Sequence, residues 1–156
     1  MDLTILLASI LAAAAPVVLA AVGETITEKS GVINLSLDGT ILLSAMAAFS
    51  VAYETQNVPL GFLVAGAVGG LVAAMIGIFS LFLNQSQVAV GFVLTLTLKD
   101  LAYFLGNSYS RIYGPQVSPF PIPALREIPF LGPVLFNHNL PVYISVLIIG
   151  LTWWYL

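Results

Sequence analysis

The stretch that decides the fold is residues 23–39, GETITEKSGVINLSLDG, which separates two strongly apolar runs. It holds three acids, one base, an amide, hydroxyl groups and three glycines, although charged residues are only 7% of the chain. We call this stretch the polar island. A polar interruption of membrane-type sequence is either a turn in water or part of a solute pathway, and these residues alone leave both interpretations open.

The composition around the polar island is that of an integral membrane protein. The chain has 156 residues, is 60% hydrophobic, and carries only seven acidic and four basic side chains, too few to cover a soluble fold. The apolar runs are continuous and do not alternate with a period of two, which favours helices over a barrel. We therefore expect an all-α polytopic helix bundle, with several passes through the cell membrane and the lipid bilayer as its solvent.

The same composition argues against several classes of function. The chain has no cysteine, so it offers no thiolate metal site and no cysteine nucleophile. A net charge of −3 without a basic run offers no basic stretch for nucleic-acid binding. Neither an HExxH or GxSxG pattern nor a phosphate-binding glycine-rich loop is present. We expect no catalytic residue, no metal and no cofactor in this chain.

About five membrane helices are predicted, because crossing about 30 Å of hydrocarbon takes roughly 20 apolar residues. The predicted ranges are 3–22, 35–53, 60–83, 88–106 and 142–156. Pro16 lies inside the first range and predicts a kink there. The last range is short for a span, so we expect a partial domain that another chain or segment completes.

The predicted 60–83 helix is rich in glycine, which allows helices to approach closely. Gly66 and Gly70 form one small-xxx-small pair, for which general helix packing is the preferred explanation.

Residues 107–141 form a proline-rich connection. Prolines at this density exclude a regular helix, but apolar residues between them favour an ordered loop or a short interfacial helix over residues 124–128. The one histidine, His138, lies in this connection. A lone histidine cannot build a metal site, so we expect it to be a surface residue.

Two adjacent charges, Lys99 and Asp100, fall in the body of the predicted 88–106 helix. A charge in the middle of the bilayer is costly, and neighbouring helical residues point about 100° apart, so these two neutralise each other poorly. One interpretation directs at least one of them to a wet cavity or to an acid such as Asp38. The other has Lys99 reaching the membrane surface. The residues give the two equal weight.

Within the polar island, the acids have structural and functional interpretations. Glu24 and Glu28 share a helical face if the first helix continues that far. Asn34 or Ser36 is suited to cap the second helix, and Asp38 in its first turn would interact favourably with the helix dipole. Alternatively, these acids bind a cation or a polar solute at an interrupted helix, as in many transporters.

The polar island also resembles a family signature. Residues 23–39 are similar to the GExIxE(K/R)xGVxNLxx(E/D)G pattern of the permease subunits of ABC importers for nucleosides and simple sugars, related to branched-chain amino-acid and ribose permeases. Residues 86–91, SQVAVG, resemble the family's NQVVxG, and residues 121–136 resemble its PIPxLxxIPxLGPxLF loop. The three motifs occur in the family's order, and the resemblance extends over nearly the whole chain.

The resemblance implies one partial permease domain over residues 1–156, with residues 107–141 on the extracytoplasmic side. It implies ABC ATPase subunits, a second permease and an extracytoplasmic solute-binding lipoprotein as partners, with ATP hydrolysis in a partner subunit. Members of the family are longer and continue into a cytoplasmic loop that docks on the ATPase. Charges at Lys99 and Asp100 depart from the family's pattern.

The function expected from these observations is nucleoside or sugar transport by alternating access. The substrate pathway residues are predicted to be Glu24, Glu28, Asn34, Asp38 and Gln87. Lys99 and Asp100 are the candidates for buried charges, with the surface interpretation left open. Two alternatives stay open: a small non-transporting membrane interaction or assembly protein, and a self-contained ion or proton pathway.

Overall fold

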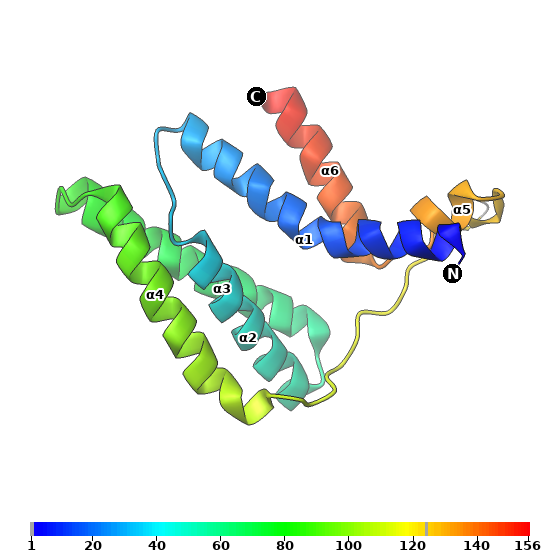
Figure 1. Ribbon diagram of the computed structural model, residues 1–156, viewed down its shortest axis with the longest axis horizontal. Helices are drawn as coiled ribbons and strands as arrows, with labels where there is room; N and C mark the ends of the chain where they lie inside the picture. Colours follow the sequence, from blue (N-terminus) through cyan, green and yellow to red (C-terminus); the bar gives the residue numbers. More distant parts are fainter. Residues whose placement is uncertain (1, 124) are drawn as a thin grey trace. The chain divides into compact units, whose positions relative to one another are not determined.

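The computed structural model describes residues 2–123 and 125–156, and these residues are mostly helical (Figure 1). Within those ranges there is no β-strand, only an isolated bridge between Pro119 and Asn139. The predicted all-α class is therefore confirmed. The α-helices are α1 (Leu3–Lys29), α2 (Leu37–Thr55), α3 (Val58–Gly77), α4 (Gln87–Gly106), α5 (Leu131–Leu135) and α6 (Leu140–Tyr155).

Three of the helical stretches are long and apolar enough to cross a membrane: Leu3–Lys29, Val58–Phe82 and Gln87–Tyr109. The second continues α3 through a π-helical turn, Ile78–Phe82, and the third adds a 3-10 turn, Asn107–Tyr109, to α4. The other two predicted membrane helices correspond to α2, which has 19 residues, and to the apolar α6, which has 16 residues. Neither reaches the combination of length and hydropathy that marks the first three. The chain is a membrane protein with helices at all five predicted places.

The first helix is longer than the predicted 3–22, because α1 continues past Pro16 and ends only at Lys29. Its end is a Schellman motif. The Val32 N–H donates to the Thr27 carbonyl and the Gly31 N–H to the Glu28 carbonyl, both at 2.9 Å. Gly31 has a positive φ of 81°, which this motif requires and which favours glycine. The first part of the polar island is thus helix, and only residues 30–36 are irregular.

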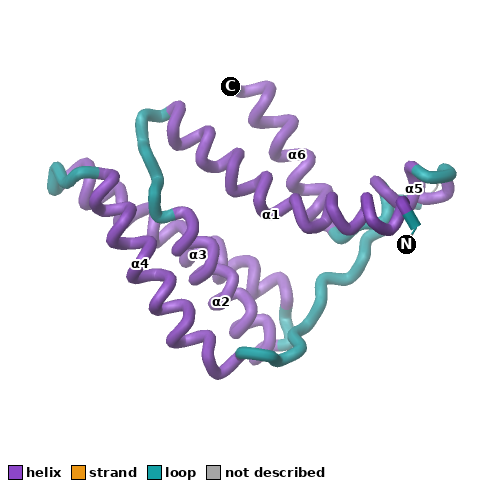
Figure 2. The backbone as a smooth tube through the Cα atoms, viewed as in Figure 1, coloured by secondary structure: helices purple, strands orange, loops and turns teal. Residues whose placement is uncertain are grey.

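The chain divides into two compact units, residues 27–116 and residues 2–26 with 117–156. Figure 2 shows the non-helical connections, of which the longest follows α4. The first of these units contains α2, α3 and α4, and its core is formed by Leu43, Val72, Ile76, Leu94, Leu98 and Ala102.

Close packing of α2 against α3 depends on a glycine other than the predicted pair. A Cβ on Gly61 would lie 2.6 Å from the Ala48 carbonyl oxygen, so the two backbones approach closely there. A Cβ on Gly66 or Gly70 would meet nothing within 4 Å beyond its own helix, so this pair makes no such contact within the described chain.

The second unit contains the later part of the proline-rich connection, in which backbone groups form hydrogen bonds with one another. The Phe120 N–H donates to the His138 carbonyl at 2.9 Å, and the Ile122 N–H to the Phe136 carbonyl at 3.1 Å. The expectation that prolines exclude regular helix needs a local correction, because α5 contains Pro133. Pro133 is the third residue of that helix, where its missing N–H has no intrahelical partner to lose.

The prediction of a surface histidine is wrong. His138 is only 5% exposed, and its Nε2 lies 2.7 Å from the Val134 carbonyl oxygen. Its backbone N–H donates to the Tyr143 hydroxyl at 3.0 Å. Val134 of α5 and Tyr143 of α6 therefore supply the partners of this buried histidine. For the predicted short helix over 124–128, the structure has a 3-10 turn at Leu125–Glu127, and residue 124 lies outside the described residues.

Candidate functional site

A polar and small-residue stripe on α4 holds the second half of the polar island. Its members recur every four residues and therefore lie along one face of the helix. We call this set the docking stripe; it consists of Gln87, Gly91, Thr95 and Lys99. Together its members contact residues 33, 35, 38 and 39.

The first contact of the docking stripe is a hydrogen bond to the irregular backbone. The Gln87 side-chain oxygen accepts from the Ile33 N–H at 3.1 Å. Ser86, just before it, caps α4 by accepting from the Ala89 N–H at 3.5 Å. Two of the three motifs that carry the family resemblance are thus joined in space, although 54 residues separate Ile33 from Gln87.

The middle of the docking stripe is a close backbone contact. A Cβ on Gly91 would lie 3.1 Å from both the backbone nitrogen and the Cβ of Leu35. The Thr95 hydroxyl donates to the Leu35 carbonyl. From the other side, a Cβ on Gly39 would lie 2.6 Å from the Thr95 carbonyl oxygen. Only glycines allow α2 and α4 to approach this closely.

The last contact of the docking stripe is an ion pair. Lys99 Nζ lies 2.7 Å from Asp38 Oδ2, as a salt bridge with a hydrogen bond. The Lys99 side chain is 36% exposed and that of Asp38 is 75% exposed, so the pair lies at the edge of the helix packing. Asp38 is the acid that one of the two sequence interpretations named as a partner for this pair of charges, and it is placed against Lys99.

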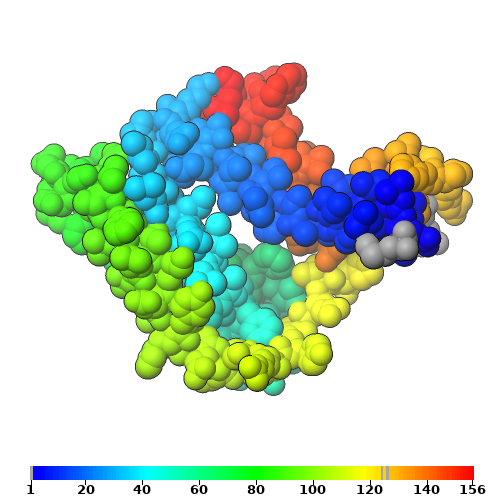
Figure 3. Space-filling model, viewed as in Figure 1, coloured from blue at the N-terminus to red at the C-terminus, as the bar shows by residue number. Residues whose placement is uncertain are grey.

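Asp100 points elsewhere. It is exposed, and no hydrogen bond or ion pair joins its side chain to another residue within 2–123 and 125–156. Large apolar side chains on α4 (green to yellow-green in Figure 3) are exposed as well, among them Phe92, Val93, Leu96 and Phe104. The predicted burial of Asp100 is therefore not found within the described chain.

The start of α2 is held by a small polar network that corrects the predicted cap. Ser36 occupies the N-cap position and is fully buried, but its side chain accepts no backbone N–H of α2. Instead, Asn34 Oδ1 accepts from the Ser36 hydroxyl at 2.7 Å and from the Ser36 N–H at 3.1 Å. This is an Asx turn. Asp38 lies in the first turn of α2, as predicted, where a carboxylate suits the helix dipole.

The other two predicted pathway acids, Glu24 and Glu28, lie in the last turns of α1. The condition for their sharing one helical face is met, because α1 continues to Lys29. The Glu28 carbonyl also takes part in the Schellman motif that ends this helix. Glu24 belongs to the compact unit of residues 2–26 and 117–156, and Glu28 to that of residues 27–116.

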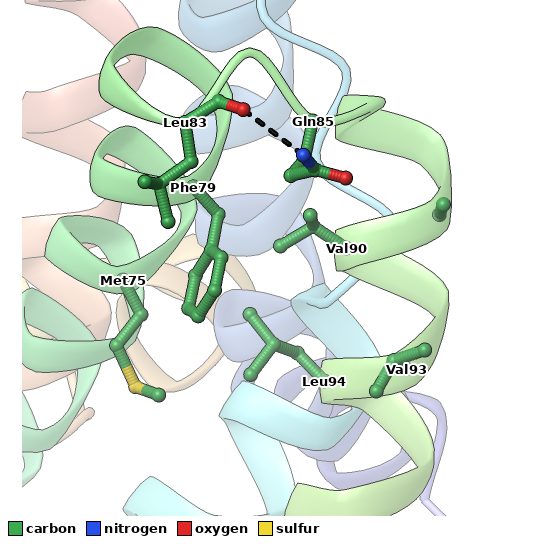
Figure 4. Close-up of a pocket in the computed structure, with 8 residues that line it drawn as sticks. Met75, Phe79, Leu83, Gln85, Val90, Val93 and Leu94 are labelled. Carbon is green, nitrogen blue, oxygen red and sulfur yellow. Dashed lines mark hydrogen bonds between the residues drawn. The ribbon is translucent and has the colours of Figure 1, made fainter.

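A separate cavity lies between the end of α3 and the start of α4 (Figure 4). It has a volume of about 610 Å³ and is lined mainly by apolar side chains, of which Phe79 and Leu94 point toward each other. Gln85 contributes an amide at its rim, whose Nε2 donates to the Leu83 carbonyl at 2.9 Å. Such a lining is poorly suited to a solute with many hydroxyl groups, which needs several hydrogen-bonding side chains.

Sequence reasoning missed Gly91 and Thr95 as members of the site. The signal was the four-residue spacing from Gln87 to Lys99, which repeats small or polar residues along a mainly apolar helix. No cluster of three or more His, Asp or Glu side chains that could hold a metal ion occurs within the described part of the chain.

The sequence that forms this site matches a known protein family. Residues 6–156 match the model of the branched-chain amino acid transport system / permease component. The chain belongs to this permease family.

Curated relatives agree with the family. The chain is 34% identical, over 92% of its length, to the "Putative glucose ABC transporter permease protein TsgC13" of Haloferax volcanii. It is 23% identical over 99% of its length to the nucleoside ABC transporter permease protein NupC of Lactococcus lactis. It is 28% identical over 96% of its length to the guanosine ABC transporter permease protein NupQ of Bacillus subtilis.

The chain spans about half the length of these relatives, namely 45%, 52% and 50% of them in the same order. No solved structure matches the chain significantly.

Proposed function

We propose that the chain forms part of the transmembrane permease of an ATP-driven importer, which moves a nucleoside or a sugar-like solute by alternating access. The observation that carries this proposal is the docking of residues 33–39 on α4, because it joins two family motifs within apolar helices. The names of the relatives, which specify glucose, a nucleoside and guanosine, support this class of solute.

The pathway residues in this proposal are Glu24, Glu28, Asn34, Asp38 and Gln87, and Lys99 takes part through its ion pair with Asp38. Glucose and guanosine are uncharged and rich in hydrogen-bonding groups, so they need polar partners in the permease and little net charge. The Asp38–Lys99 pair provides donors and acceptors with no net charge, which suits such a solute.

The partners in this proposal are two ABC ATPase subunits, a second permease subunit and an extracytoplasmic solute-binding lipoprotein, assembled in the cell membrane. ATP hydrolysis takes place in the ATPase subunits and drives the change of access. Residues 107–141 lie on the extracytoplasmic side, where the binding protein delivers the solute.

The test is uptake by the complete transporter in cells that lack their own systems for these solutes. Labelled glucose, guanosine, uridine and leucine form the panel, and a transporter with an inactive ATPase is the control. ATP-dependent uptake of glucose or a nucleoside that exceeds leucine uptake at least tenfold is expected. Equal uptake with the inactive ATPase, or uptake of leucine alone, would contradict the proposal.

A further inference from the structure

We infer that the docking stripe holds residues 33–39 and α4 together as one rigid body throughout transport, with Lys99 as the positioning residue for Asp38. This inference rests on the proposed function and specifies which part of the permease does not move.

The backbone contact between α2 and α4 argues against sliding. A Cβ on Gly39 would already be 2.6 Å from the Thr95 carbonyl oxygen and 2.9 Å from the Thr95 Cα, so the two backbones touch. A shift along either helix would bring bulkier neighbouring residues into this contact. Tightly packed interfaces of this kind change between discrete arrangements and do not deform continuously.

The hydrogen bonds argue against separation. The Ile33 N–H and the Leu35 carbonyl belong to irregular backbone between helices, and their partners are the side chains of Gln87 and Thr95. Both bonds are exposed in this chain, so each by itself restrains the segment weakly, and it is their combined loss that opposes separation. Moving α4 away from residues 33–39 would remove both partners at once.

The ion pair adds a third restraint at the far end of the docking stripe. Removing Lys99 takes away the cation that lies 2.7 Å from the Asp38 carboxylate, and in a membrane domain a charge without a counter-charge is costly. Lys99 therefore sets the position and the charge balance of Asp38. The change of access must then come from movement between this rigid body and other parts of the transporter.

The first experiment fixes the contact covalently in the complete transporter. The chain has no cysteine, so Leu35→Cys with Gly91→Cys introduces a single defined pair. The Leu35 Cβ lies 3.1 Å from the Cβ position on Gly91, near the separation of about 3.5–4.5 Å that a disulfide needs. Bond formation is followed by loss of labelling with a maleimide polymer.

Oxidised protein is expected to lose at least 80% of its thiol labelling and to keep uptake within about twofold of the reduced protein. A bond that forms but lowers uptake at least tenfold, with recovery on reduction, would overturn the inference. Because a cysteine at Gly91 is tightly placed, Ile33→Cys with Gln87→Cys and a short bifunctional thiol reagent provides a second pair. Failure of both pairs to link would also overturn it.

The second experiment tests Lys99 as a positioning residue, with uptake normalised to inserted protein. Lys99→Met is expected to lower uptake at least tenfold, whereas Lys99→Arg keeps it within about threefold. Adding Asp38→Asn to Lys99→Met is expected to restore uptake at least threefold over Lys99→Met alone, because it removes the uncompensated charge. A double variant no better than Lys99→Met would overturn the role of Lys99.

The two proposals fail in different ways. If the unmodified transporter takes up no solute of the panel, the proposed function fails. The yield of both thiol pairs still reports whether residues 33–39 stay on α4, because labelling does not depend on transport.

Discussion

The polar island and the proline-rich connection both interrupt apolar sequence, yet their backbone groups find hydrogen-bond partners in different places. Residues 33–39 depend on side chains of a distant helix, since Gln87 and Thr95 supply partners for Ile33 and Leu35. Residues 119–139 depend mainly on themselves, through backbone hydrogen bonds between Phe120 and His138 and between Ile122 and Phe136.

This difference predicts how each region responds to substitution. A segment held by individual side chains loses its position when one of them is removed. A segment that pairs with itself tolerates changes of exposed side chains and is sensitive to its buried ones. Four substitutions test this contrast, from the largest expected effect to the smallest.

Gly39→Leu should have the largest effect, because its Cβ would meet the Thr95 carbonyl oxygen, and a backbone atom cannot move aside as a side chain can. Overpacking of this kind costs about 3 kcal/mol of unfolding free energy. The expected result is a lower thermal unfolding midpoint in detergent and loss of uptake. Gly66→Leu is the matched control, since its Cβ would meet nothing within 4 Å in the described chain. Equal effects of the two variants would contradict the close contact of α2 with α4.

His138→Ala should affect the other region. It leaves the Val134 carbonyl oxygen without its buried partner, at a cost of about 2 kcal/mol. Faster cleavage of the 117–141 segment in limited proteolysis is the expected result. A lone exposed histidine would show no change, so unaltered cleavage would restore the surface assignment made from the sequence.

Thr95→Val keeps the shape of the side chain and removes only the hydroxyl that donates to the Leu35 carbonyl. We expect a loss of about 1 kcal/mol, measured as a shift in denaturant midpoint. Thr97→Val is the matched control, because the Thr97 hydroxyl bonds within α4 to the Val93 carbonyl. If both variants lose the same amount, the bond to Leu35 contributes nothing particular to the docking of the island.

Gln87→Leu should have the smallest effect. Its hydrogen bond to the Ile33 N–H is exposed in this chain, and water can replace part of it, so about 0.5 kcal/mol is expected. Gln85→Leu serves as the control, because the Gln85 amide bonds locally to the Leu83 carbonyl. A larger loss of unfolding free energy for Gln85→Leu than for Gln87→Leu would contradict the greater importance of the distant partner.

Much of the fold could be predicted from hydrophobic patterning, and the errors of that prediction have local causes. The first helix was placed too short because the charges at Glu24, Glu28 and Lys29 resemble a turn, whereas the helix stops only where Gly31 adopts a positive φ. His138 was assigned to the surface because it lies in the proline-rich connection and a lone histidine cannot build a metal site, but it is buried against the Val134 carbonyl four residues earlier. The extracytoplasmic location of residues 107–141 and the pathway roles remain predictions.

The sequence by itself determined that this is an all-α membrane protein, where its helices lie and which stretch interrupts them. Transfer of apolar residues from water depends mainly on local composition, so these features can be read along the chain. Only the tertiary structure decided that Asp38 pairs with Lys99 and that Gly39 and Gly91 allow α2 and its preceding loop to touch α4. Residues about 60 positions apart meet according to how whole helices align, which no local pattern specifies. The polar island thus consists of a helix end and a docked segment, and its partner is the four-residue stripe of α4.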